Sequence, residues 1–255
     1  MRKKLRFPNQ HGAMLSASLD VPDGDIRAYA LLAHCFTCNK SLRAAGHISK
    51  ALLAEGIAVF RFDFTGLGES EGDFSDTNFT SNVQDILSAG DFMAQAGYAP
   101  NILMGHSLGG TAVLKAARHM ASVQAVVTLA SPASPLHVAE QFSDAKKKIA
   151  AEGRATVMLA GRPFTLKQQF LDDLESASVL ADIANLHKAL LVLHAPKDMT
   201  VGIEHAATIF QTAKHPKSYV SLDESDHLLS NPEDARYVGH VVAAWSARYV
   251  KGEVS

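Results

Sequence analysis

The chain has 255 residues, 47% of them hydrophobic, and a formal net charge of −2 at pH 7. This composition predicts a globular protein with a large core, and the near-neutral charge gives no electrostatic basis for binding nucleic acid or an anionic membrane. The apolar runs fall short of the roughly 18 residues that a membrane span needs, and two cysteines are too few for a secreted disulfide scaffold. We therefore expect a cytoplasmic protein.

The first predicted elements are two strands at residues 5–9 and 13–21. Their polar and apolar residues alternate, as in an antiparallel hairpin at a sheet edge. Short apolar runs then alternate with longer amphipathic segments. The runs are predicted strands at residues 28–34, 57–62, 101–106, 125–130, 189–195 and 217–222, and the segments are predicted helices at 42–55, 82–96, 108–120, 200–214 and 232–249. Continuously apolar strands separated by helices predict an α/β fold with a mostly parallel sheet covered on both faces.

Residues 131–188 interrupt this alternation. They contain charged helical segments at 138–152 and 167–180 and a candidate hairpin that turns near Gly161. We expect one domain over residues 1–255, in which 131–188 is a lid inserted over the carboxyl ends of the strands. The apolar residues of this segment either line an acyl pocket or form a small core of their own, and they include Phe142, Met158, Phe164 and Phe170.

The stretch GHSLGG at residues 105–110 fits the motif Gly-x-Ser-x-Gly, with a predicted strand before it and a predicted helix after it. This context indicates a sharp, strained turn that exposes the Ser107 hydroxyl at a helix N-terminus. Small residues two positions away on each side let strand and helix approach. Ser107 is therefore the candidate nucleophile, and the alternative is an ordinary helix N-cap.

A serine nucleophile needs a base and an orienting acid, which follow it in the order Ser, Asp/Glu, His. Asp198 follows the predicted strand 189–195, and His227 lies in a loop after the last predicted strand. We predict these two as acid and base. Asp198 has the alternative role of capping the next helix, and His227 that of a surface histidine. The rival acids adjoin His227 too closely to reach its far ring nitrogen easily, and they are Asp223, Glu224 and Asp226.

Acyl transfer also needs two N–H donors for the oxyanion, normally from the residue after the nucleophile and from a loop after an earlier strand. Leu108 supplies the first, and we predict Phe36, in the loop HCFTCNK (34–40), as the second. Cys35 and Cys38 then lie at the mouth of the site. Their spacing also permits a redox pair or half of a metal site. No second cysteine pair is present, however, and the helix does not begin directly at the motif.

The sequence resembles the α/β-hydrolase superfamily, whose oxyanion loop often has glycines where Cys35 and Cys38 stand. More closely, it resembles the hydrolase half of bacterial proteins in which an α/β hydrolase is fused to an OsmC-type domain. The stretches that carry this resemblance are HCFTCNK, RFDFTGLGESEG (61–72), GHSLGG, LAGRPF (159–164), LLVLHAPKD (190–198) and HPKSYVSLDESDHLL (215–229). It implies Ser107, Asp198 and His227 as catalytic residues, Phe36 and Leu108 as oxyanion donors, and an OsmC-type partner or fused domain.

The residues and the resemblance together predict a serine hydrolase that cleaves small to medium carboxylic esters or thioesters through an acyl-enzyme, without a cofactor or metal. The alternatives are a thiol-dependent redox protein that uses Cys35 and Cys38, and a non-catalytic binding protein on a hydrolase scaffold. Besides a small-molecule ester, the sequence leaves a homodimer open, and we expect no nucleic-acid or membrane partner.

Overall fold

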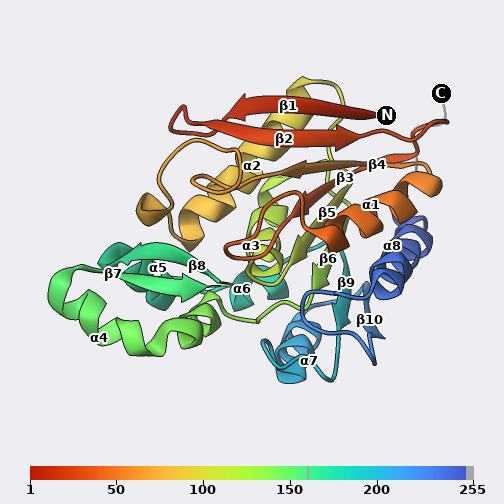
Figure 1. Ribbon diagram of the computed structural model, residues 1–255. Coiled ribbons are helices and arrows are strands. Elements are labelled where there is room, and N and C mark those ends of the chain that lie inside the picture. Colours follow the sequence, from red (N-terminus) through yellow and green to blue (C-terminus); the bar gives the residue numbers. More distant parts are fainter. Residues whose placement is uncertain (160, 251–255) are drawn as a thin grey trace.

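The structure, a computed structural model, describes residues 1–159 and 161–250. A central sheet of eight strands has the order β1-β2-β4-β3-β5-β6-β9-β10 (Figure 1). The strands are β1 (Arg2–Pro8), β2 (Met14–Asp20), β3 (Ala28–Ala33), β4 (Ile57–Phe62), β5 (Ile102–His106), β6 (Ala125–Leu129), β9 (Ala189–His194) and β10 (Lys217–Ser221). β1 and β2 pair antiparallel, β2 pairs antiparallel with β4, and all further pairs are parallel.

The inner strands owe their place to their composition. Every residue of β4, β5, β6 and β9 is buried, whereas only Phe7 of β1 is fully buried. Side chains on both faces of the inner strands leave water, and each large apolar side chain gains roughly 1.5–3 kcal/mol by this burial. The predicted α/β fold with a mostly parallel sheet is confirmed.

Helices cover both faces of the sheet. The helices on these two faces are α1 (Arg43–Ala54), α2 (Phe79–Gln95), α3 (Leu108–Ala116), α7 (Ile203–Thr212) and α8 (Pro232–Ser246). α1 and α8 pack together on one face (Figure 1), and their core includes Ile48 and Val242. α2, α3 and α7 share a second core on the other face with Ile86, Val113 and Ile209. None of the helices in the described part of the chain is both long and apolar enough to cross a membrane.

Side chains fix the starts of two of these helices. Asn78 and Ser81 form a reciprocal capping box at the N-terminus of α2, and Asn231 accepts the N–H of Glu233 at the start of α8. Such a cap contributes about 1 kcal/mol. α3 has no side-chain cap hydrogen bond, although Ser107 occupies the N-cap position. The Ser107 hydroxyl therefore does not cap the helix and can bind another partner.

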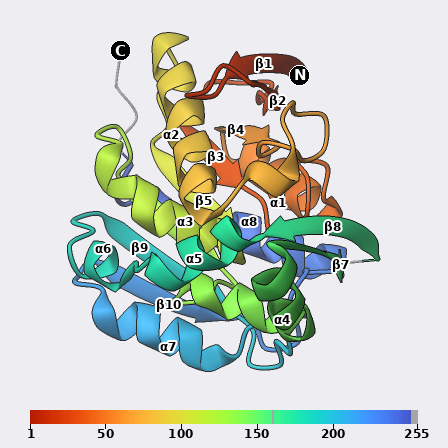
Figure 2. The same ribbon diagram turned by 90° about the vertical axis from the view of Figure 1, so that its left-hand side faces the viewer.

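Residues 131–188 form a separate group of elements between β6 and β9. They are a 3₁₀ helix (Pro135–Phe142), α4 (Ser143–Glu152), the hairpin β7 (Arg154–Leu159) and β8 (Arg162–Lys167), α5 (Gln168–Ser176) and α6 (Leu180–Ala184). The hairpin is a two-stranded sheet of its own. Figure 2 shows α4, α5 and the hairpin on the side that faces the viewer. The predicted helix 138–152 is thus a 3₁₀ turn followed by α4, and the predicted helix 167–180 ends at Ser176.

Candidate active site

Ser107 lies in the sharp turn between β5 and α3, where its φ is 54° and its ψ is −128°. A non-glycine residue in such a region is strained by about 1–3 kcal/mol. The turn is held because the Ser107 N–H donates to the carbonyl oxygen of Leu129 on β6, at 2.9 Å. This is the strained turn that the motif predicts.

The glycines of the motif are required by close packing. A Cβ on Gly105 would lie 2.3 Å from the carbonyl oxygen of Gly109, and a Cβ on Gly109 would lie 2.3 Å from the carbonyl oxygen of His34. Both distances are far inside van der Waals contact. The first turn of α3 therefore presses directly on β5 and on the end of β3.

Ser107, His227 and Asp198 come together in a continuous chain of hydrogen bonds. His227 Nε2 lies 3.1 Å from Ser107 Oγ, and His227 Nδ1 lies 2.8 Å from Asp198 Oδ2. Because a carboxylate only accepts, Nδ1 carries the ring proton and Nε2 can accept from the serine hydroxyl. The geometry is that of a base poised on a nucleophile and oriented by an acid.

Asp198 is itself held by the backbone of the turn that follows it. Its Oδ1 accepts the N–H groups of Thr200 and Val201 at 2.8 and 2.9 Å. Burial opposes ionisation, but the hydrogen bonds from His227 and these two N–H groups outweigh it, so the pKa of Asp198 lies below its usual range. His194 Nε2 donates to the Val201 carbonyl oxygen at 2.8 Å and fixes the same turn.

The rival acids have other partners. Asp223 interacts with Ser221, Glu224 with Lys197, and Asp226 accepts the N–H of Ser230. Within the described residues, Asp198 is the carboxylate hydrogen-bonded to the His227 ring. The capping alternative for Asp198 is not realised, because α7 begins at Ile203 with Gly202 at its N-cap and without a side-chain cap hydrogen bond. The second oxygen of Asp198 instead binds the turn that precedes this helix.

The predicted oxyanion loop, residues 34–40, is anchored at both ends. At its start, His34 Nδ1 donates to the Cys35 carbonyl oxygen at 2.8 Å, and burial lowers the pKa of His34 to about 4, which keeps the ring neutral. At its end, Lys40 is buried, and its Nζ lies 2.5 Å from Asp63 Oδ2. Removing one partner of such a buried pair costs about 3–5 kcal/mol.

The two predicted oxyanion donors come from two segments that meet, the loop 34–40 and the start of α3, and both residues line one small cavity. Leu108 is the first residue of α3, and Phe36 follows the buried Cys35 in the loop. In residues 1–159 and 161–250, neither N–H donates to a protein acceptor. Thr37, the next residue, has a φ of 64°, so the irregular backbone falls beside Phe36 rather than at Cys35.

Cys35 and Cys38 form a disulfide, with their Cα atoms 5.3 Å apart. The Cys38 N–H also donates to the Cys35 carbonyl oxygen at 3.2 Å, so the loop is a tight turn closed by a covalent bond. The residues 1–159 and 161–250 contain no free cysteine. Nor do these residues contain a group of three or more histidines, cysteines or acids arranged to hold a metal ion.

A cavity of about 540 Å³ opens over Ser107 and His227. Its walls are the oxyanion loop, the start of α1 and the segment 131–188, which contributes Gln141, Leu159 and Arg162. The Arg162 guanidinium donates to the carbonyl oxygen of Thr37 and so ties the hairpin to the oxyanion loop. The sequence marks Leu159 and Arg162 only as part of the stretch LAGRPF that carries the family resemblance, and it does not predict them or Gln141 as site residues, because only the folded segment brings them to the site.

The apolar residues predicted as pocket lining are placed differently. Phe142 and Phe170 are buried with ring centroids 6.1 Å apart, Phe164 packs on Phe74 at 4.8 Å, and Met158 is 66% exposed. None of the four lines the cavity over Ser107. The alternative prediction, a small core of the segment's own, does not describe them either, because Phe142 and Phe170 belong to the core that also contains α2 and α3, and Phe170 stacks on Phe36 at 5.4 Å.

Comparisons with known proteins place the chain in a family. The profile of the family Hydrolase_4, described as serine aminopeptidase, S33, matches residues 25–175. A solved esterase domain from Rhodothermus marinus is 44% identical with a TM-score of 0.79, over 98% of this chain and 99% of that one. The mouse mitochondrial palmitoyl-protein thioesterase ABHD10 is 27% identical over 70% of this chain and 62% of that protein.

A structure of Est1E from Butyrivibrio proteoclasticus with ferulic acid bound is 20% identical with a TM-score of 0.79, over 96% of this chain and 99% of that one. This likeness concerns the fold alone. The profile match covers more than half of the chain, and the likeness to the Rhodothermus domain covers nearly all of it. The chain therefore belongs to the Hydrolase_4 family, and it is a hydrolase with the α/β-hydrolase fold.

Proposed function

We propose that this protein hydrolyses carboxylic esters or thioesters of small to medium acyl groups through a Ser-His-Asp triad. The observation that carries the proposal is the hydrogen-bonded chain from Ser107 through His227 to Asp198, which opens on a cavity of about 540 Å³. The similarity to an esterase domain and to a thioesterase supports this substrate class.

The mechanism follows from the proton positions. His227 Nε2 takes the Ser107 proton while Oγ attacks the carbonyl carbon, and Asp198 stabilises the imidazolium that forms. The N–H groups of Phe36 and Leu108 donate to the oxyanion of the tetrahedral intermediate. The intermediate collapses, and His227 gives its proton to the departing alcohol or thiol. Water, deprotonated by His227, then releases the acid from Ser107.

The test is a series of p-nitrophenyl esters of increasing acyl length and a matched acyl thioester, with an aminoacyl p-nitroanilide to represent amide cleavage. We expect Ser107→Ala to lower kcat by about 10³-fold or more, and Asp198→Asn to lower it by about 10³–10⁴-fold with little effect on KM. Activity that survives in Ser107→Ala would overturn the serine mechanism. A preference for the anilide would replace the ester with an amide substrate.

We also propose an OsmC-type protein as a partner, on the sequence resemblance alone. To test this, the chain is mixed with a purified OsmC-type protein and separated by size-exclusion chromatography. Light scattering then gives the mass of each eluted species. A shared peak at the summed mass is the expected result, and separate elution at tens of micromolar contradicts the proposal.

A further inference from the structure

His106, the residue before the nucleophile, contacts the base rather than the substrate cavity. Its ring is buried at the end of β5, and its Nε2 lies 2.7 Å from the carbonyl oxygen of His227. The two imidazole rings lie 5.1 Å apart. Since a carbonyl oxygen can only accept, His106 Nε2 carries a proton and donates.

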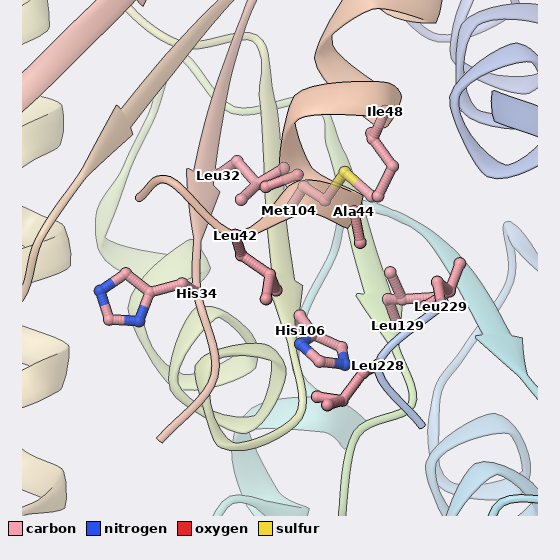
Figure 3. A pocket seen from close by; sticks show the side chains of 12 residues that line it. Leu32, His34, Leu42, Ala44, Ile48, Met104, His106, Leu129, Leu228 and Leu229 are labelled. Atoms are coloured by element: carbon pink, nitrogen blue, oxygen red, sulfur yellow. The ribbon is translucent and has the colours of Figure 1, made fainter. Parts of the chain in front are cut away.

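The other ring nitrogen of His106 lacks a partner. Nδ1 is buried, with no hydrogen bond within the described residues. The side chain borders a small apolar cavity whose walls include Leu42, Met104 and Leu129 (Figure 3). A second proton, on Nδ1, would be buried without an acceptor, which is costly.

The ring therefore stays neutral. Burial, and then the nearby His227, lower the pKa of His106 to about 3. The hydrogen bond to the His227 carbonyl oxygen, and then the Asp198 carboxylate, act in the opposite direction, and His34 adds slightly to the lowering. At neutral pH the Nε2 donor is thus always present, and His106 does not exchange protons during turnover.

Besides the contacts of the His227 ring and the hydrogen bond from His106, the Leu222 N–H joins the base loop to the His194 carbonyl oxygen on β9, and Glu224 forms an ion pair with Lys197. Other hydrogen bonds lie within the loop. Ser225 N–H donates to the Leu222 carbonyl oxygen, and Asp226 accepts the N–H groups of Leu229 and Ser230. Leu229 is 2% exposed and lines the same apolar cavity as His106 (Figure 3). The hydrogen bond from His106 joins this loop to the central sheet at the residue that must face the nucleophile.

We propose that His106 is a positioning residue, whose Nε2–H fixes the main chain of His227 so that the imidazole of His227 stays aligned with Ser107. Two consecutive residues of one turn thereby hold the base at two points. His106 binds its carbonyl oxygen, and Ser107 meets its side chain. This inference rests on the proposed function, and it adds a residue that never touches substrate.

Removing the donor frees the base loop to shift. Misplacement of a reacting group by about 1 Å costs up to about 10²-fold in rate. We expect His106→Leu, which keeps the bulk but loses the donor, to lower kcat by about 10–100-fold while KM changes by less than about threefold. His106→Gln, whose amide nitrogen reaches about as far as Nε2, should recover most of this loss.

The experiment measures kcat and KM on a p-nitrophenyl ester for both variants, together with the rate at which a fluorophosphonate labels Ser107. His106→Asn is the matched control for polarity, because its shorter amide stops short of the His227 carbonyl. Ile48→Val is the control for packing, because Ile48 lines the same cavity without a hydrogen bond. Thermal melting of each variant shows that it is folded.

We expect kcat and the labelling rate to be highest in wild type and Ile48→Val, lower in His106→Gln, and lowest in His106→Asn and His106→Leu. If His106→Leu does not fold, the comparison of Gln with Asn decides the question in the same way. Equal rates for Gln and Asn, or a Leu variant within twofold of wild type, would overturn the inference. Failure of the proposed function is separate, because it shows as activity that persists in Ser107→Ala.

Discussion

The Cys35–Cys38 disulfide closes a ring around Phe36, one of the two proposed oxyanion donors. With His34 at one end of the loop and Lys40 at the other, the covalent bond is the third restraint on this backbone. An oxyanion hole acts because its donors are in place before charge develops. Opening the disulfide ring should therefore lower kcat more than it raises KM.

We predict that reduction of the disulfide by a dithiol, which converts it to two thiols, lowers kcat by about 3–10-fold. Removing an oxyanion donor outright costs about 10²–10³-fold, and a loosened one should cost less. Cys38→Ser should show the same loss and should not respond further to the dithiol. Iodoacetamide without reductant should leave the wild-type rate unchanged. Full activity in the reduced protein, verified by thiol titration, would contradict the prediction.

Single residues differ in how far sequence reveals them. Ser107, Asp198 and His227 follow predicted strands in a fixed order, so local pattern was enough to predict them, and the structure brings them within hydrogen-bonding distance. The disulfide between Cys35 and Cys38 was not predicted, because spacing alone does not say whether two cysteines are bonded to each other. His106 lies inside the motif, but its bond to residue 227 depends on the fold of a distant loop.

At the scale of elements, the contact between α3 and β3 is set by Gly109. A Cβ there would meet the carbonyl oxygens of His34 and Ala33 at 2.3 and 2.9 Å. Since both oxyanion donors belong to the segments that meet here, a side chain at this position would separate them. The packing of one helix turn thus fixes the width of the proposed oxyanion hole.

We predict that Gly109→Ala destabilises the protein by about 1–3 kcal/mol and also lowers kcat. Gly46→Ala in α1 is the matched control, because nothing lies within 4 Å of a Cβ there and alanine is favoured over glycine in a helix by about 1 kcal/mol. The measurements are urea denaturation and ester hydrolysis. Equal changes in stability and in kcat for the two variants would show that the close contact at Gly109 affects neither.

The hairpin β7–β8 is tied to the oxyanion loop through Arg162, whose guanidinium also lies over the Phe164 ring at 5.2 Å. We predict that Arg162→Gln raises KM several-fold with a smaller change in kcat, because the cavity wall is loosened while the triad is untouched. Arg154→Gln, at the exposed start of the same hairpin, should behave like wild type. An unchanged KM across the ester series would rule out a role for this tie.

The strands of the main sheet were predicted to within a few residues, because burial on both faces leaves continuous apolar runs such as 57–60 and 189–193. The segment 131–188 was predicted less well. Its helices are charged, and their ends depend on contacts with each other, as where the chain leaves the 3₁₀ turn at Phe142 and enters α4. Periodicity alone does not encode such contacts.

At the scale of the whole molecule, buried histidines link stability to pH, and burial lowers the pKa of three of them, His34, His106 and His194. Burial lowers the pKa of His34 to about 4 and that of His106 to about 3, against about 6.5 in an unfolded chain. Between these values the unfolded chain binds more protons than the folded one, so stability rises with pH across this window.

We therefore predict that the free energy of unfolding falls as the pH is lowered from about 6.5 toward 4, by up to about 1.4 kcal/mol per unit for each histidine. Urea denaturation at several pH values measures this slope. His106→Gln removes one titrating group and should make the slope shallower. The same slope in wild type and variant would show that His106 does not contribute.

The family profile ends at residue 175, so it includes Ser107 but neither Asp198 nor His227. The nucleophile lies on one side of the segment 131–188 in the sequence, and the acid and base lie on the other. β6 and β9 pair in register across this boundary, from Ala125 with Ala189 to Leu129 with Leu193. The sheet itself therefore joins the two halves of the proposed catalytic machinery.

A chain divided between β6 and β9 would give two fragments, one with the serine and the other with the acid and base. On the proposed mechanism, neither fragment alone would hydrolyse an ester, and activity would return only when β6 and β9 paired again. The rate of ester hydrolysis would then measure how much of the two fragments has reassembled.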